Sequence, residues 1–64
     1  MDYTNSQIRE LIAEYIHSER DRRLLERRLI DGVVFERLGE EFDMSDRQVR
    51  RIVYKLQEKL FKNI

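Results

Sequence analysis

Apolar residues recur every three or four positions through most of the chain, which is the spacing of helices that bury one face. The first stripe consists of Ile8, Leu11, Ile12, Tyr15 and Ile16. We expect its helix to begin at Thr4 or Asn5, because either side chain can accept a hydrogen bond from a free N–H group of the first turn. The stripe either closes the core of one chain or offers an apolar strip to a second copy, and the pattern leaves both open.

A second helix is predicted from about Glu19 to Ile30, with Ser18 as its N-cap. Its apolar positions are Leu24, Leu25, Leu29 and Ile30. Asp31-Gly32 ends this helix, because glycine readily adopts the left-handed conformation that follows a helix C-terminus.

Two more helices are predicted, over about residues 34–41 and from a cap at Ser45 to about Lys62, with Phe42-Asp43-Met44 as the turn between them. At 100° per residue, the apolar residues of the last helix fall in one narrow stripe. These residues are Val49, Ile52, Val53, Leu56 and Leu60. Arg47 and Arg51 lie on the opposite side, at about 160° and about 200° from Val49, and are therefore expected to point away from the core.

The last two helices also have the spacing of a helix-turn-helix. Counted from Phe35, apolar residues occupy the fourth, eighth, tenth, fifteenth and eighteenth positions, and these are Leu38, Phe42, Met44, Val49 and Ile52. The fifth position is Gly39, where we expect two closely crossing helices to leave no room for a side chain. In this motif the second helix enters the major groove of DNA.

Composition limits the fold and the chemistry. The chain has 64 residues, 41% of them charged, with no proline and two glycines. It is expected to form one all-α domain of four to five helices over residues 1–64, with the helix-turn-helix over about 34–62. Without cysteine and with His17 as the sole histidine, we expect no metal site, cofactor or enzymatic activity. No apolar run approaches a membrane span, so a cytoplasmic protein without a membrane partner is expected.

The net charge is zero, but the charges are unevenly distributed. Residues 19–30 sum to +2 and residues 47–64 to +5, whereas residues 1–18 sum to −2 and residues 31–46 to −5. A protein that approaches phosphates needs a local positive face rather than a positive total. The arginines at 20, 22, 23, 27 and 28 are expected mainly to pair within their own helix.

The sequence resembles region 4 of bacterial sigma factors, the domain that reads the promoter −35 element. The resemblance covers about residues 20–61 and rests on RDRRLLERRLIDG and VVFERLGEEFDMSDRQVRRIVYKLQEKL. It implies a recognition helix over about residues 46–61 in the major groove. The implied base contacts are Asp46, Arg47, Gln48, Arg50 and Arg51. Phosphate contacts are expected at Tyr54, Lys55 and Lys59.

Among the implied base contacts, Arg47 and Gln48 have the side chains best suited to reading sequence. Arginine can form two hydrogen bonds with guanine, and glutamine can do the same with adenine. Two positions depart from the family. Val34 stands where a Thr or Ser cap is usual, and Asp43 replaces the turn glycine.

No part of the sequence corresponds to sigma region 2, so we expect a stand-alone, sigma-like transcriptional regulator of bacterial or phage type. Its partner would be double-stranded DNA, with RNA polymerase as a further possible partner and a homodimer possible. The alternative is a protein-interaction module that binds RNA polymerase or a sigma or anti-sigma partner. The zero net charge and the acidic stretch 31–46 favour this alternative.

Overall fold

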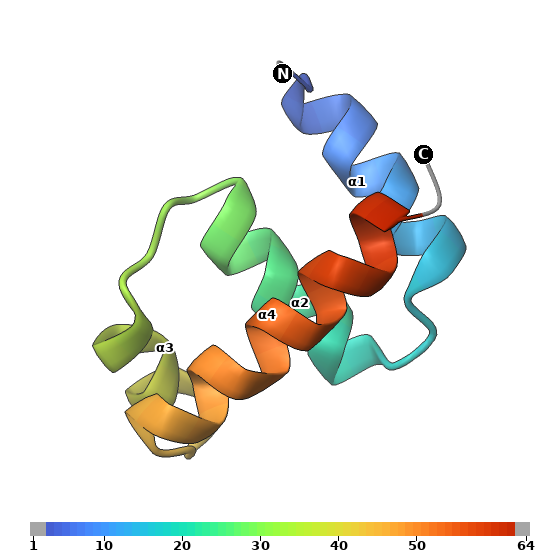
Figure 1. Cartoon of the computed structure of the whole chain (residues 1–64). Helices are drawn as coiled ribbons and strands as arrows, with labels where there is room; N and C mark the ends of the chain where they lie inside the picture. The colour runs from blue at the N-terminus through green and yellow to red at the C-terminus, as the bar shows by residue number, and fades with distance from the viewer. Residues whose placement is uncertain (1–2, 63–64) are drawn as a thin grey trace.

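Four helices make up the described part of the chain, residues 3–62 of a computed structural model (Figure 1). They are α1 (Asn5–Tyr15), α2 (Glu19–Leu29), α3 (Phe35–Phe42) and α4 (Asp46–Lys62). The predicted all-α fold of four to five helices is confirmed with four, and the boundaries predicted for α2, α3 and α4 lie within one residue of those observed.

Side chains fix the starts of α1 and α2. The Thr4 hydroxyl accepts from the Gln7 N–H at 3.1 Å, and the Gln7 side chain accepts from the Thr4 N–H at 2.8 Å. This reciprocal capping box makes Thr4 rather than Asn5 the N-cap, so that α1 begins at Asn5. The Ser18 hydroxyl accepts from the Asp21 N–H at 3.4 Å, as expected of the cap of α2.

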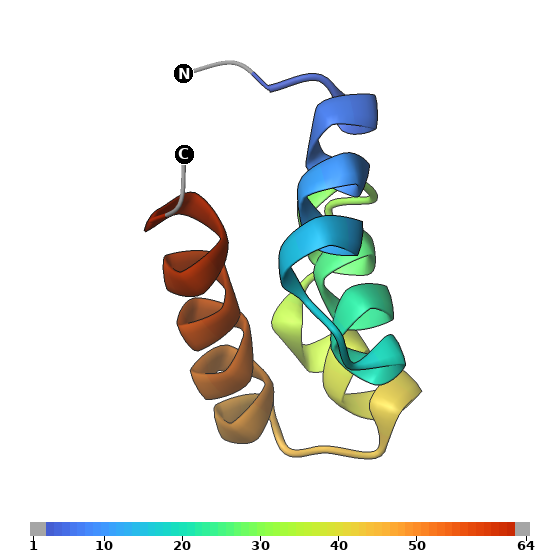
Figure 2. The same cartoon turned by 90° about the vertical axis from the view of Figure 1, so that its right-hand side faces the viewer.

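One core joins all four helices. Its buried side chains are Ile12, Ile16, Leu24, Leu25, Leu38, Val49, Val53 and Leu60, each at most 2% exposed. α1, α2 and α4 each contact the other two, and the start of α1 lies at the same end of the molecule as the end of α4 (Figure 2). The apolar stripe of α1 therefore closes the core of the single chain, with Ile8, Leu11 and Tyr15 packed at its edge.

The turn between α3 and α4 depends on two unusual backbone positions. Asp43 ends α3 in the left-handed conformation, with φ 54° and ψ 49°, which aspartate adopts more readily than most residues. A Cβ atom on Gly39 would lie 2.5 Å from the Met44 carbonyl oxygen. The predicted exclusion of a side chain at Gly39 is confirmed, but its cause is the backbone of the turn and not a crossing helix.

Two other backbone positions lie at the end of α2 and the start of α3. Gly32, just after α2, has φ +68°, the left-handed conformation expected there. α3 begins after Val34 without a side-chain cap, so the first N–H groups of α3 lack the hydrogen bond that Ser or Thr would supply.

The arginines of α2 hold the neighbouring helices rather than only their own. Arg22 donates to the carbonyls of Ala13 and Ile16 and so caps the end of α1. Arg27 donates to both carboxylate oxygens of Glu41 in α3, at 3.0 and 2.6 Å, and to Asp31 at 3.1 Å. The expected pairing within the helix is therefore wrong for these two arginines, because the partners that they reach lie in other elements.

Candidate nucleic-acid interface

The start of α4 is fixed by a second capping box. The Ser45 hydroxyl accepts from the Gln48 N–H at 3.1 Å, and Gln48 Oε1 accepts from the Ser45 N–H at 3.1 Å. The predicted cap at Ser45 is thus present, and Gln48 completes it. The S-x-x-Q spacing is the sequence signal for this box. This signal was missed when Gln48 was interpreted as a base contact.

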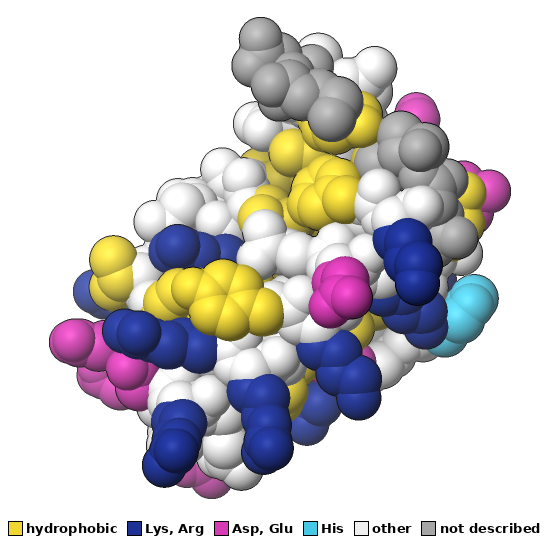
Figure 3. Space-filling view, in the orientation of Figure 1, with side chains coloured by type: hydrophobic (Ala, Val, Ile, Leu, Met, Phe, Trp, Pro, Cys, Tyr) yellow, Lys and Arg dark blue, Asp and Glu magenta, His cyan; other side chains and the backbone are white. Residues whose placement is uncertain are grey.

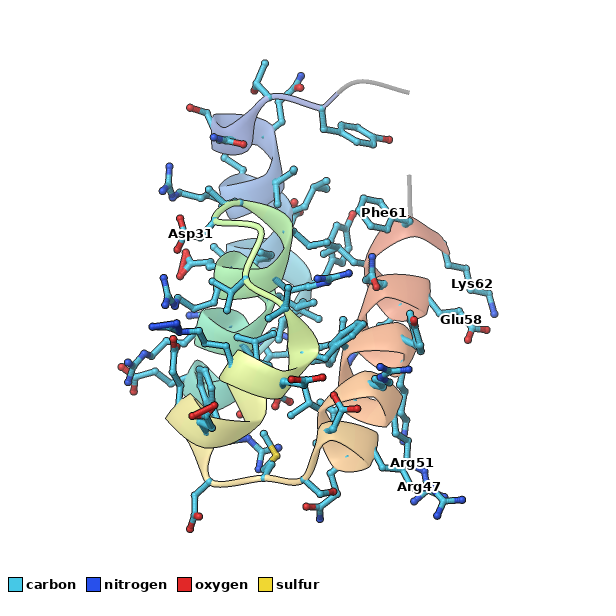
Figure 4. The ribbon with its side chains drawn as sticks, turned by 90° about the vertical axis from the view of Figure 1, so that its left-hand side faces the viewer. Asp31, Arg47, Arg51, Glu58, Phe61 and Lys62 are labelled. Atoms are coloured by element: carbon cyan, nitrogen blue, oxygen red, sulfur yellow. The ribbon has the colours of Figure 1, made fainter. Side chains whose placement is uncertain are left out.

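Arg47 and Arg51 project from the outer side of α4, one turn apart and away from the other helices (Figure 4). Neither side chain forms a hydrogen bond or ion pair with another residue of the described range 3–62. Together with Ser45 and Gln48 they line a shallow hollow at the surface. The outward orientation expected from the helical periodicity is confirmed.

Arg50 lies in a different environment from Arg47 and Arg51. Its Nε atom is 3.3 Å from Asp46 Oδ2, and its guanidinium lies 5.3 Å from the centre of the Phe35 ring. The Arg28 guanidinium lies 4.1 Å from the same ring. Cation–π attraction and the ion pair therefore hold Arg50 and Asp46 against the start of α3.

The three expected phosphate contacts lie on two flanks of α4. Tyr54 is 59% exposed and meets the Phe35 ring edge-on, with a centroid distance of 5.8 Å. Lys55 and Lys59 are exposed on the other flank, where they line a hollow with Arg20 at the start of α2. Because Arg50 also lies at the Phe35 ring, basic side chains lie on both sides of the outward-facing pair Arg47 and Arg51.

Positive charge dominates the visible face at the start of α4. Lys and Arg side chains gather over the lower part of this face and continue along α4, with few acidic side chains among them (Figure 3). Further along the outer side of α4, the acidic side chain of Glu58 follows Arg51 (Figure 4). Glu58 therefore interrupts the positive charge on the outer side of α4 beyond Arg51.

Two acidic side chains of the stretch 31–46, those of Asp31 and Glu41, meet at Arg27. Asp31 lies on the side of the molecule opposite Arg47 and Arg51 (Figure 4). The hydrogen bonds that Glu41 accepts from Arg27 lower the pKa of the Glu41 carboxyl group, so Glu41 is ionised and paired at neutral pH. These two carboxylates are therefore paired with Arg27 and not with Arg47 or Arg51.

Five expected base contacts therefore divide by environment. The structure brings Asp46, Arg47, Gln48, Arg50 and Arg51 together in the first two turns of α4. It leaves Arg47 and Arg51 extended, and it engages the other three with Ser45, Phe35 or one another. The sequence pattern did not predict that Arg28, Arg50 and Tyr54 gather around Phe35. The only sequence signal for this cluster is the aromatic residue at the start of α3.

The described helices include none that is long and apolar enough to cross a membrane. Within residues 3–62, no three His, Asp or Glu side chains are placed to hold a metal ion. No family model, curated protein or solved structure matches the chain.

Proposed function

We propose that the chain binds double-stranded DNA sequence-specifically and regulates transcription, with α3 and α4 acting as a helix-turn-helix. The observation that carries the proposal is the pair Arg47 and Arg51, which project one turn apart from the start of α4 without a partner in the described chain. An extended arginine pair at the exposed start of a helix can reach base edges, because the major groove admits an α-helix.

The flanks of α4 support the same function. Tyr54 and Arg50 on one side, and Lys55 and Lys59 on the other, lie where two phosphate backbones would border a helix in the groove. The resemblance to sigma region 4 agrees with this placement and adds the expectation that the target is a promoter element.

A fluorescence-anisotropy titration with labelled random duplex at two salt concentrations tests DNA binding. We expect binding at low salt that weakens steeply as salt rises, because bound cations release counterions from DNA. Arg47→Ala with Arg51→Ala should weaken binding, whereas Arg9→Ala should not. Arg9 is a suitable control because it is an exposed arginine of α1 that lines a separate hollow with Arg27 and Asp31. Absence of binding at low salt would contradict the proposal.

A second candidate is a protein-interaction module that binds RNA polymerase or a sigma or anti-sigma partner. It is favoured by the exposed apolar side chains of Val34 and Tyr54, at 60% and 59%, on either side of Phe35. Pull-down of purified polymerase distinguishes the two functions. If Arg47→Ala and Arg51→Ala abolish DNA binding and leave polymerase capture intact, the DNA function does not depend on the polymerase contact.

A further inference from the structure

The polar side chains at the start of α4 fall into two classes. Gln48 and Arg50 are held by the protein: Gln48 by Ser45, and Arg50 by Asp46 and Phe35. Arg47 and Arg51 are held by no other residue in the range 3–62. Only the second class can change direction without breaking an interaction of the folded chain.

The capping role of Gln48 conflicts with the reading of adenine. An amide oxygen has two acceptor positions, and Gln48 Oε1 receives the Ser45 N–H at 3.1 Å and the Ser45 hydroxyl at 3.4 Å. Adenine is read by accepting from N6 and donating to N7. To supply that acceptor, Gln48 would have to leave the capping box and deprive the Ser45 N–H of its acceptor.

The chemistry of Arg47 and Arg51 selects a different base. A guanidinium group donates hydrogen bonds and accepts none. Guanine presents two acceptors in the major groove, O6 and N7, whereas adenine presents one acceptor and one donor. Both arginines can therefore bind guanine through two hydrogen bonds, and neither can bind adenine in that way.

The spacing of the two arginines sets the spacing of the bases. Side chains four residues apart on a helix have Cβ atoms about 5–6 Å apart. Successive base pairs of DNA rise by about 3.4 Å. The pair Arg47 and Arg51 thus spans one or two base-pair steps.

We propose that Arg47 and Arg51 each read one guanine, on base pairs one or two steps apart, and that Gln48 is a helix cap that does not read adenine. This inference rests on the proposed DNA-binding function and makes its target specific: a duplex element with two closely spaced guanines.

Selection of bound duplexes from a random pool tests the inference. The unaltered protein should enrich two guanines one or two steps apart, on the same or on opposite strands. Arg47→Ala should abolish the preference at one of these positions and Arg51→Ala the preference at the other, each a loss of roughly 5- to 150-fold in discrimination. Gln48→Glu keeps a capping-box residue, so it should select the same guanines with an affinity lowered uniformly by its negative charge.

The outcomes separate the inference from the function beneath it. If the unaltered protein selects an adenine position that Gln48→Glu loses, Gln48 is a reader and the inference is overturned while DNA binding stands. Selection of sites without the guanine pair would likewise overturn the inference and leave DNA binding established. If no duplex binds at low salt, the proposed function fails and the inference fails with it. Gln48→Ala is a second test, because it removes the capping-box side chain and any contact of that side chain with DNA. This variant should still select both guanines.

Discussion

The arginines of α2 and those at the start of α4 are the same residue type in opposite situations. Arg22 caps the end of α1, and Arg27 ties α2 to Glu41 of α3. Arg47 and Arg51 extend from α4 and contact no partner in the described chain. The first pair is used by the fold, and the second remains available to a ligand.

This difference shows that local charge alone does not locate a binding surface. Residues 19–30 and 47–64 both carry excess positive charge in the sequence. In α2 much of that charge is engaged by carbonyl and carboxylate oxygens of neighbouring elements. The available positive charge is therefore concentrated on α4, and substitutions should separate stability from binding along this division.

Gly39→Ala should have the largest effect of the substitutions, because it disturbs the turn that positions the start of α4. The added Cβ would lie 2.5 Å from the Met44 carbonyl oxygen, and backbone atoms would have to move. We expect a loss of about 1–3 kcal/mol in the free energy of unfolding, together with weaker DNA binding as the start of α4 shifts. Urea unfolding and anisotropy titration measure the two effects.

The control for Gly39→Ala is Gly32→Ala, where an added Cβ meets no atom within 4 Å but the φ of +68° is strained. That variant should lose some stability and keep its DNA affinity, because it lies away from the α3–α4 turn. Equal stability of Gly39→Ala and the unaltered protein would show that the turn is looser than described.

Arg22→Ala and Arg51→Ala should separate fold from function, since each removes one guanidinium. Arg22→Ala leaves the carbonyls of Ala13 and Ile16 without their donor, so we expect a loss of about 1–3 kcal/mol in unfolding free energy. Arg51→Ala should change stability by less than about 0.5 kcal/mol and weaken DNA binding by about 1–3 kcal/mol. Thermal unfolding and titration of both variants, at a temperature where both are folded, give the comparison. A stability loss on Arg51→Ala equal to that of Arg22→Ala would remove the distinction.

The sequence predicted the helices well because each depends on information local to it. The apolar stripe ending at Leu60, the cap at Ser45 and the breaker Gly32 all act within a few residues. The outward direction of Arg47 and Arg51 followed from the same periodicity. These features could be predicted because a helix fixes the relative directions of its own side chains.

The interactions between helices could not be predicted in the same way. The hydrogen bond from Arg27 to Glu41 joins residues 14 positions apart in the sequence. The Ala13 carbonyl oxygen that accepts from Arg22 belongs to another helix, α1. The Phe35 ring gathers Arg28 and Arg50 from α2 and α4. Such partners depend on how the helices pack, which spacing within one helix does not specify. The capping role of Gln48 was missed for a different reason. Its S-x-x-Q signal is local and present in the sequence, but a glutamine at this position is also a plausible base contact.

Gln48→Ala tests whether Gln48, unlike Arg47 and Arg51, contributes to the stability of the fold. It removes the acceptor for the Ser45 N–H, and we expect a loss of about 1 kcal/mol in unfolding free energy, the net contribution of one hydrogen bond. Gln48→Glu should retain most of that stability, because glutamate also completes a capping box. Chemical unfolding of both variants provides the measurement. Equal stability of Gln48→Ala and the unaltered protein would mean that the cap contributes nothing and that Gln48 is available for other contacts.

The smallest expected effect concerns the α2–α3 contact at low pH. Arg27 lowers the pKa of Glu41 chiefly through the hydrogen bonds that it donates. The ionised carboxylate therefore stabilises the folded state, fully above the pKa that Glu41 has in the unfolded chain. The contribution is lost as the pH falls through the lower pKa of the folded state.

Glu41→Gln should consequently be less stable than the unaltered protein at neutral pH, and the difference should shrink as the pH falls into the acid range. Urea unfolding at a series of pH values measures it, with Glu40→Gln as the control because Glu40 is exposed and neighbouring. A deficit that is unchanged by acid would mean that packing of the side chain, rather than its charge, joins α3 to α2. In that case the positive charge of Arg27 would not stabilise the fold. Arg27 would then resemble Arg47 and Arg51, whose charges the fold does not use.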